Sequence, residues 1–339
     1  MSKRKLSKRQ KDRIHAIQEK RRYRAMQQNT ADQNEIHSST LGPELRGTVI
    51  TNFGTQVDIE TTNSQNNVVR CHIRANVDPL VTGDKVIWRS ADPFGVVVAS
   101  EKRRSELLRP DIYGNLRPVA ANIDIIAIVF SAQPAAFSNL IDRYLVAAEA
   151  QRIKSILIVN KIDMLTDAEY PEIHRLIADY QFIGYDIFQV CAKTGQGIDQ
   201  LQSYLADKTA VFVGQSGVGK SSLINYLQPE AKMAVGALSV GKAKGTHTTT
   251  ISKLFHLTGG GKLIDSPGIR EFGLTHLSQS QVIEGFVDFR PFLGHCKFRD
   301  CSHNKELGCA LLQAVSDNKV LAFRLTNYRQ ILQSIEEKL

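Results

Sequence analysis

The sequence has no long apolar run, few cysteines and, beyond its first residues, no excess of charge. No stretch of the 339 residues approaches the roughly 18–20 consecutive apolar residues that a membrane-spanning helix needs. The basic N-terminus has no apolar segment behind it, so we expect neither a secretory signal nor a membrane protein. Hydrophobic residues make up 42% of the chain, which excludes global disorder, and the length predicts about two or three domains.

The five cysteines are too few and too unevenly placed for a disulfide framework. Their number is odd, and three of them lie within the 14 residues 296–309. This pattern predicts a reducing compartment and a metal site. Cys71 and Cys191 fall in predicted strands, and we expect both to pack as small apolar residues.

The charge of the chain is concentrated at its N-terminus. Of 43 Lys and Arg residues, 11 lie in residues 1–24 with two acids, whereas the other 315 residues hold 32 of each sign. Residues 1–41 are polar and basic, and they predict a flexible arm that cannot bury enough surface to order itself. Such an arm either contacts nucleic acid phosphates or is simply solvated. Leu6 is the only leucine of residues 1–24, which disfavours insertion into a membrane.

Residues 42–112 have the composition of a small β-barrel. Gly, Asn and Asp separate short runs rich in Val, Ile and Thr at residues 47–60, 67–75, 84–90 and 94–100. About five short strands are typical of an OB-like barrel, a fold that often binds RNA. A barrel that serves only as a packing module fits the sequence equally well.

In residues 113–274, apolar strands alternate with helical segments. We expect strands at residues 123–130, 155–159, 186–190 and 209–213, helices at 138–150, 171–180, 198–205 and 220–227, and a hairpin formed by 253–257 and 261–264. This alternation predicts a doubly wound α/β domain.

A glycine-rich segment between a predicted strand and a predicted helix has the phosphate-loop pattern G-x-x-x-x-G-K-[ST]. It runs from Gly214 to Ser221. The glycines let the backbone approach phosphates, and the amides of residues 217–222 at the helix start would bind the anion. Lys220 would reach the β- and γ-phosphates, and Ser221 would coordinate Mg²⁺. The segment contributes Gly214, Gln215, Ser216, Gly217, Val218, Gly219, Lys220, Ser221 and Ser222 to the predicted nucleotide site.

A second motif, Asn160-Lys161-Ile-Asp163, directly follows a predicted strand. The Asp163 carboxylate would accept two hydrogen bonds from guanine, and adenine offers no such pair of donors. The segment Cys191-Ala192-Lys193 fits the last guanine-contacting loop, although Ser is commoner at its first position. Together the two motifs predict a preference for GTP over ATP.

A third motif, Asp265-Ser-Pro-Gly268, ends a predicted apolar strand. Asp265 would hold Mg²⁺ through water, and the Gly268 amide would sense the γ-phosphate. Between the phosphate loop and this motif, a polar stretch contains Thr249 and Thr250, one of which would complete the Mg²⁺ shell. We assign Thr250 to this role, beside Ser221.

The order of the motifs departs from that of an ordinary GTPase, in which the phosphate loop comes first. Here the guanine motifs at 160–163 and 191–193 precede the phosphate loop and Asp265. A circular permutation explains this order and is tolerated where the original termini lie close together. The Asp265 motif then leads directly into the next domain, so we infer that the nucleotide state is transmitted there.

Four candidate metal ligands lie close together near the C-terminus. Cys296, Cys301, His303 and Cys309 have the composition of a tetrahedral Cys₃His zinc site, with no position left open for catalysis. Unpaired buried cysteines remain an alternative, as does an iron–sulfur cluster, which a histidine ligand makes less favoured. Predicted helices at residues 279–289 and 318–337 would complete a small helical domain, residues 275–339.

These parts together resemble the bacterial circularly permuted GTPases of the RsgA/YjeQ type. The resemblance covers the OB-like barrel, the permuted phosphate-loop GTPase domain and the helical zinc-binding domain. It implies a cytoplasmic enzyme that hydrolyses GTP and binds the small ribosomal subunit and its rRNA late in maturation, stimulated by the ribosome. We expect a monomer with GTP or GDP, Mg²⁺ and one structural Zn²⁺, no membrane partner, and other assembly factors as further partners.

The catalytic group that orients the attacking water is not evident. Ile269 follows the Asp265 motif where a glutamine would serve, so intrinsic hydrolysis should be slow. His247 is the nearest candidate beside Lys220 and Thr250, and it could equally contact RNA or solvent. A nucleotide-gated binding module with incidental hydrolysis is a competing hypothesis, and a GTPase bound to a membrane surface ranks last.

Overall fold

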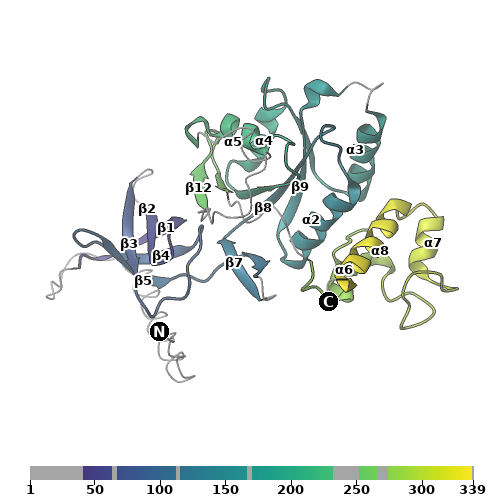
Figure 1. The fold of residues 1–339 in the computed structure, drawn as a ribbon, viewed down its shortest axis with the longest axis horizontal. Helices are drawn as coiled ribbons and strands as arrows, with labels where there is room; N and C mark the ends of the chain where they lie inside the picture. Colours follow the sequence, from purple (N-terminus) through teal and green to yellow (C-terminus); the bar gives the residue numbers. More distant parts are fainter. Residues whose placement is uncertain are drawn as a thin grey trace.

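The computed structural model describes residues 41–62, 67–111, 115–165, 170–231, 252–265 and 274–337. Figure 1 shows three parts in a row: a β-barrel, a sheet with helices on both faces, and a cluster of helices. This is the predicted succession of barrel, α/β domain and helical domain. Within the described ranges, no helix combines the length and apolar character that crossing a membrane requires.

The barrel consists of five strands, as predicted: β1 (Glu44–Asn52), β2 (Gln56–Thr61), β3 (Val68–Ile73), β4 (Lys85–Arg89) and β5 (Gly95–Ser100). They pair in the order β1-β2-β3-β5-β4, and β4 pairs back onto β1, which closes the barrel. Only the β3–β5 pair is parallel. Cys71 has no exposed surface among the core side chains, and burial raises the pKa of its thiol to about 12. It packs as the small apolar residue that the sequence predicts.

The central sheet has the strand order β10-β9-β8-β11-β13-β12. Its strands are β8 (Ile125–Phe130), β9 (Lys154–Asn160), β10 (Ile187–Val190), β11 (Thr209–Val213), β12 (Lys253–His256) and β13 (Lys262–Asp265). All neighbours are parallel except the β12–β13 hairpin. The parallel strands therefore end at one common edge.

Helices cover both faces of this sheet, because successive side chains of a strand point to opposite faces and here both sets are apolar. In β8, Ile126 and Ile128 pack toward α2 (Ser138–Ala150) and α3 (Pro171–Ile183). The intervening Ala127 and Val129 pack toward α4 (Ile198–Leu205) and α5 (Lys220–Leu227). The doubly wound arrangement is thus confirmed, and α2, α4, α5 and β11 have the predicted bounds.

A two-stranded hairpin between barrel and sheet escaped prediction. It is formed by β6 (Glu106–Pro110) and β7 (Leu116–Ala121). The two strands contain Pro110 and Pro118. A proline argues against a strand because it has no backbone N–H to donate to the neighbouring strand. A separate ribbon with open edges tolerates them.

The C-terminal helices differ from their predicted bounds. Helix α6 (Gln279–Glu284) begins with a capping box from Ser278 and ends before Gly285, so the predicted helix 279–289 is too long. Helix α8 (Ala322–Glu336) starts four residues later than predicted, because Asn318 adopts a left-handed φ of 57° that ends the preceding turn. A further helix, α7 (Ala310–Ser316), was not predicted.

Both outer parts are joined to the central sheet by specific contacts. Thr51 of β1 pairs with Lys253 of β12, and the Thr82 hydroxyl donates to the Ser252 carbonyl at 3.0 Å. On the other side, the core of the helical part includes Val146 and Ala147 of α2. The barrel is therefore attached through the β12–β13 hairpin, and the helical part through α2.

Candidate functional site

The predicted nucleotide motifs meet at the carboxyl edge of the central sheet. The phosphate loop follows β11, the motif 160–163 begins at the last residue of β9, residues 191–193 follow β10, and Asp265 is the last residue of β13. Ligands of open α/β sheets bind at this edge. The parallel strands therefore bring segments that are far apart in sequence to the same edge of the sheet.

The phosphate loop closes around the side chain of its own lysine. The Lys220 Nζ donates to the carbonyls of Gly214, at 2.7 Å, and of Gln215, at 2.6 Å. Gly219 is the N-cap of α5 at a φ of 92°, and no side chain caps this helix. A Cβ at Gly219 would also clash with the Asn160 amide. The loop therefore offers an ammonium and an uncapped helix start, which suit phosphate oxygens.

The buried Asn160 side chain holds the nucleotide loops together. Its Nδ2 donates to the Val218 carbonyl at 2.9 Å, and its Oδ1 accepts from the Ala192 amide at 3.1 Å. Both ends of the amide are therefore bound to main chain. Asn160 ties the phosphate loop to the loop after β10, a bracing role that the motif alone did not reveal.

Lys161 reaches from the guanine motif to the phosphate loop. It has a left-handed φ of 64°, and its Nζ donates to the carbonyls of Gly217 and Gln133, both at 2.7 Å. Gln133 lies in the connection between β8 and α2 and was not among the predicted residues. It takes part through its carbonyl, and a backbone contact leaves no mark in the sequence.

Asp163, the predicted specificity residue, is exposed and lies next to a residue that the sequence described only in part. The Cys191 thiol donates to the Asp163 Oδ1 at 3.1 Å. Cys191 is buried, as expected of a small apolar residue, but its thiol also has this polar role. The apolar description of Cys191 is therefore incomplete, while Lys193 beside it is exposed.

Several predicted residues lie outside the described part of the chain. These are Thr249, Thr250, His247, Ile269 and Gly268. Their assignments remain predictions. Asp265 itself is described and ends β13 at the expected edge.

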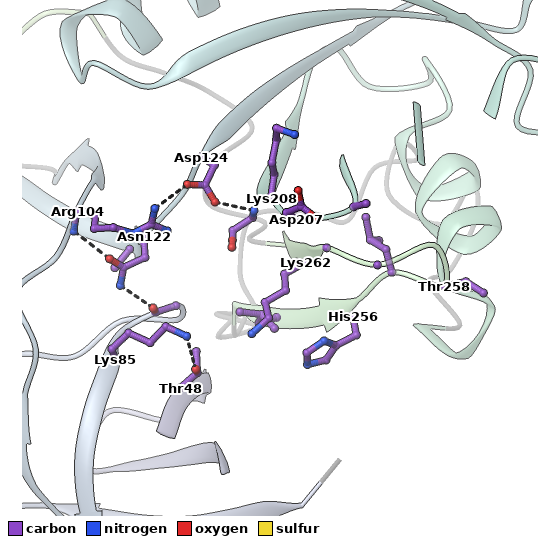
Figure 2. Close-up of a pocket in the computed structure, with 18 residues that line it drawn as sticks. Thr48, Lys85, Arg104, Asn122, Asp124, Asp207, Lys208, His256, Thr258 and Lys262 are labelled. Atoms are coloured by element: carbon purple, nitrogen blue, oxygen red, sulfur yellow. Dashed lines mark hydrogen bonds and ion pairs between the residues drawn. The ribbon is translucent and has the colours of Figure 1, made fainter. Parts of the chain in front are cut away.

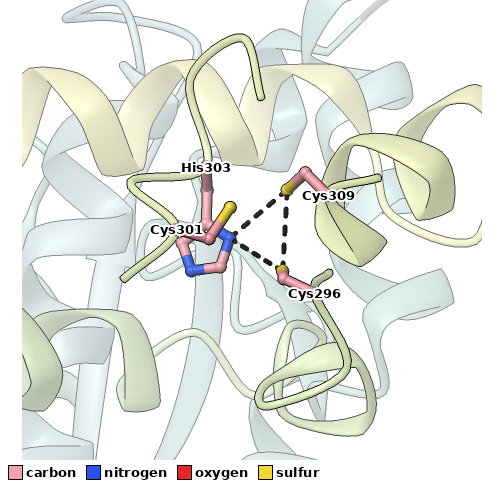
Figure 3. A group of neighbouring side chains, drawn as sticks. All are labelled: Cys296, Cys301, His303 and Cys309. Carbon is pink, nitrogen blue, oxygen red and sulfur yellow. Dashed lines mark hydrogen bonds between the residues drawn. The ribbon is translucent and has the colours of Figure 1, made fainter. Parts of the chain in front are cut away.

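The four predicted metal ligands converge, as Figure 3 shows. The candidate ligand atoms of Cys296, Cys301, His303 and Cys309 all lie within 4.8 Å of one another. The Cys296 and Cys309 sulfurs are 3.8 Å apart, and the His303 Nδ1 is 3.6 Å and 3.4 Å from them. Zn–S and Zn–N bonds of about 2.3 and 2.0–2.1 Å in a tetrahedron give roughly 3.8 and 3.6 Å for these edges. The arrangement therefore fits zinc.

Neighbouring groups fix the loop that carries these ligands. The Arg329 guanidinium of α8 donates to the carbonyls of His303, at 2.8 Å, and of Asn304, at 2.9 Å. Burial lowers the pKa of His303, which favours the neutral imidazole that binds metal. Hydrogen bonds from the Ser302 side chain and from loop amides hold the pKa of Glu306 at about 2. Hydrogen bonds from residues that are not metal ligands therefore also hold this loop in place.

Comparison with known proteins decides the family. A family model described as RsgA GTPase matches residues 100–275. The chain is 51% identical to a small ribosomal subunit biogenesis GTPase RsgA of Pseudomonas aeruginosa strain LESB58, over 99% of both chains. The chain belongs to the RsgA GTPase family. It is therefore a GTP hydrolase, and the family implies a guanine nucleotide with Mg²⁺.

Other relatives and solved structures agree with this membership. An RsgA of Azotobacter vinelandii strain DJ is 50% identical over 99% of both chains. The fold is similar to that of YloQ, a circularly permuted GTPase, with a TM-score of 0.70 and 29% identity over 91% of this chain and 99% of YloQ. YjeQ from Thermotoga maritima gives a TM-score of 0.71 and 26% identity over 86% of this chain and 99% of that one. The permuted motif order is thus a property of the family fold.

Proposed function

We propose that this GTPase binds the small ribosomal subunit and its rRNA and assists late maturation of the subunit. In this proposal, binding to the subunit stimulates the hydrolysis of GTP to GDP and phosphate. The observation that carries the proposal is full-length similarity, at about half of all positions, to relatives named small ribosomal subunit biogenesis GTPases. The enzyme would act as a cytoplasmic monomer, and other assembly factors are further candidate partners.

In this proposal the nucleotide lies along the carboxyl edge of the sheet. Asp163 accepts the two guanine donors, the stem of Lys161 covers the base, and Ala192 and Lys193 flank it. The phosphates take the place of the Gly214 and Gln215 carbonyls around the Lys220 ammonium. A charge-assisted contact to phosphate is stronger than a contact to a neutral carbonyl, so this exchange favours binding.

The residues for Mg²⁺ are Ser221 at the start of α5, Asp265 at the end of β13 and Thr250. When bound, the ion neutralises charge that develops on the phosphates. Ser221 and Asp265 lie at the ends of neighbouring elements, β11–α5 and β13, which suits a shared ligand. Zn²⁺ on Cys296, Cys301, His303 and Cys309 has a structural role.

The barrel carries a surface suited to RNA, which we call the aromatic face: Phe53, Arg70, His72 and Phe94. Phe53, 41% exposed, lies in the β1–β2 connection, and Phe94, 39% exposed, in the β4–β5 connection. Arg70 stacks 4.2 Å from the Phe53 ring centre, and the His72 ring contacts Phe94 edge-on at 5.3 Å. OB-folds bind oligonucleotides with strands 2–3 and these two loops, where bases stack on aromatic rings.

Steady-state GTP hydrolysis with and without purified small subunits tests the proposal. We expect strong stimulation by small subunits and none by large subunits, which serve as the control. Tight GTP-dependent binding without stimulation would instead favour a nucleotide-gated binding module. Absence of both binding and stimulation would contradict the proposed function, whatever the basal GTPase rate.

A further inference from the structure

A cavity of about 490 Å³ lies between the barrel and the central sheet, away from the nucleotide edge. Its walls come from the barrel strands β1 and β4, the connections flanking the β6–β7 hairpin, the α4–β11 turn, and the β12–β13 hairpin. The volume far exceeds that of one water, roughly 30 Å³. None of its lining residues belongs to the predicted nucleotide motifs or to the cysteine cluster.

The cavity is lined by more positive than negative side chains. Lys85, Arg104, Lys208 and Lys262 line it against Asp124 and Asp207. Figure 2 shows Lys85 from the barrel and Lys262 from β13 extending into the same space, with His256 beside them. The ammonium group of Lys208 is already bound to main chain, because its Nζ donates to the Tyr204 carbonyl at 2.6 Å.

The carboxylates near the cavity are already engaged. Asp124 pairs with Arg104 at 3.1 Å and accepts from the Thr209 amide at 2.9 Å. Glu60 contacts His256 at 2.5 Å and Lys262 at 3.8 Å. Glu101, whose charge also acts on Lys85, pairs with Arg46 at 3.5 Å.

Lys85 contributes an ammonium group to the cavity. Its Nζ donates to the Thr48 hydroxyl at 2.7 Å, and in the described part of the chain no carboxylate forms an ion pair with it. Burial lowers the pKa of Lys85 and the nearby charge of Lys262 lowers it further, while the charges of Glu101 and Glu60 offset part of this effect. An anion between the two ammonium groups would remove this repulsion.

We propose that this cavity binds a phosphate group, held between Lys85 and Lys262 with Arg104 at its rim. Phosphate offers several acceptor oxygens and a charge of more than one, which suits two converging ammonium groups. The group comes either from the backbone of a bound RNA, which rests on the proposed function, or from a free phosphate compound. A phosphate there would tie the barrel to the strand that ends in Asp265.

The first test is a ³¹P NMR titration of inorganic phosphate into the full chain, with its nucleotide site filled by Mg²⁺ and a non-hydrolysable GTP analogue. We expect Lys85→Met combined with Lys262→Met to weaken phosphate binding by about tenfold or more, since charged hydrogen bonds are removed. Lys85→Arg with Lys262→Arg should retain binding, which separates lost charge from lost folding. Lys319→Met, on the far helical part, is the matched control.

The second test identifies the source of the phosphate. For an RNA backbone, the double methionine variant should reduce the slope of log affinity for small subunits against log salt by about 0.7–0.9 per lost contact. Lost phosphate binding with an unchanged slope would assign the site to a free phosphate compound. Equal phosphate affinity in the double variant and the unsubstituted protein would overturn the proposal, as would no binding to either. Failure of small-subunit binding by the unsubstituted protein would contradict only the proposed function.

Discussion

Arg324 of α8 donates a hydrogen bond to the Asp142 carboxylate of α2, and neither side chain has any exposed surface. Tyr180 and Asn327 also donate to Asp142, at 2.5 and 2.7 Å, and Arg324 contacts Asp288 at 2.8 Å. These side chains link the nucleotide-binding part to the helical part. A buried charge with this many partners fixes one arrangement of the two.

Replacement of Arg324 by Met should be strongly destabilising. It leaves the buried Asp142 carboxylate without its counter-charge, so we expect the free energy of unfolding to fall by roughly 3–5 kcal/mol. Urea denaturation measures the change. Arg175→Met is the control: this residue is 85% exposed in its pair with Asp179 and should change stability by less than about 1 kcal/mol. Adding Asp142→Asn should restore part of the loss, and additive losses would argue against a coupled pair.

Asp163→Asn should exchange the base preference of the enzyme. An amide cannot accept both guanine donors, so we expect GTP affinity to fall by about 10²-fold or more. Xanthine carries a carbonyl where guanine has its exocyclic amine, and the new amide can donate to it. Fluorescent nucleotide titrations with both bases provide the measurement, and Asp179→Asn is the control. Unchanged GTP affinity would exclude Asp163 from the base site.

Cys191→Ala should weaken GTP binding without changing the base preference. The thiol contact to Asp163 is lost, and because a thiol is a weak donor we expect GTP affinity to fall by only about threefold to tenfold. Cys191→Ser keeps a donor and should bind GTP as well as the unsubstituted protein. If alanine and serine weaken binding equally, packing rather than the hydrogen bond explains the effect.

Cys301→Ser should abolish metal binding in the C-terminal cluster. With one of four ligands lost, zinc content by mass spectrometry should fall from about one per chain toward zero, and the thermal midpoint should fall. Cys71→Ala is the control, because Cys71 lies in the barrel core and should leave the zinc content unchanged. Full zinc retention in Cys301→Ser would contradict a four-ligand site, and iron in the purified protein would point to a cluster instead.

The double change Phe53→Ala and Phe94→Ala should weaken binding to small subunits. Each stacked base is worth about 1–3 kcal/mol, so the loss of one base from each of the two rings should weaken binding by about thirtyfold or more. GTP affinity should stay the same, since both rings lie on the barrel. Phe182→Ala provides the comparison, because Phe182 is 65% exposed on α3. Equal subunit affinity of the double variant would rule out the aromatic face as an RNA contact.

The sequence predicted best those elements whose stability comes from their own pattern. The buried parallel strands and amphipathic helices such as α2 and α4 are long or strongly periodic, and their predicted bounds agree closely with the structure. The six- and seven-residue helices α6 and α7 are too short to be stable alone and depend on packing and on the cysteine loop. Their ends could not be read from periodicity.

The same division holds for the site. Residues of contiguous motifs, such as Lys220 and Cys309, could be proposed from the sequence because their chemistry follows from local spacing. The bracing contacts of Asn160, the Gln133 carbonyl and the Cys191 thiol join segments that only the fold brings together. Such contacts depend on the order of the strands in the sheet, and this order cannot be read from a single sequence.

The ladder pair between Thr51 and Lys253 joins the central sheet to the barrel, so that one hydrogen-bonded sheet runs from β10 to β4. The hairpin in the middle, β12–β13, begins just after Ser252 and ends at Asp265, so its ends adjoin the stretch that contains Thr250 and the motif that begins at Asp265. Because β1 of the barrel is paired with β12, a rotation of this hairpin would move the barrel with it. The displacement would be largest for the barrel residues farthest from the hairpin.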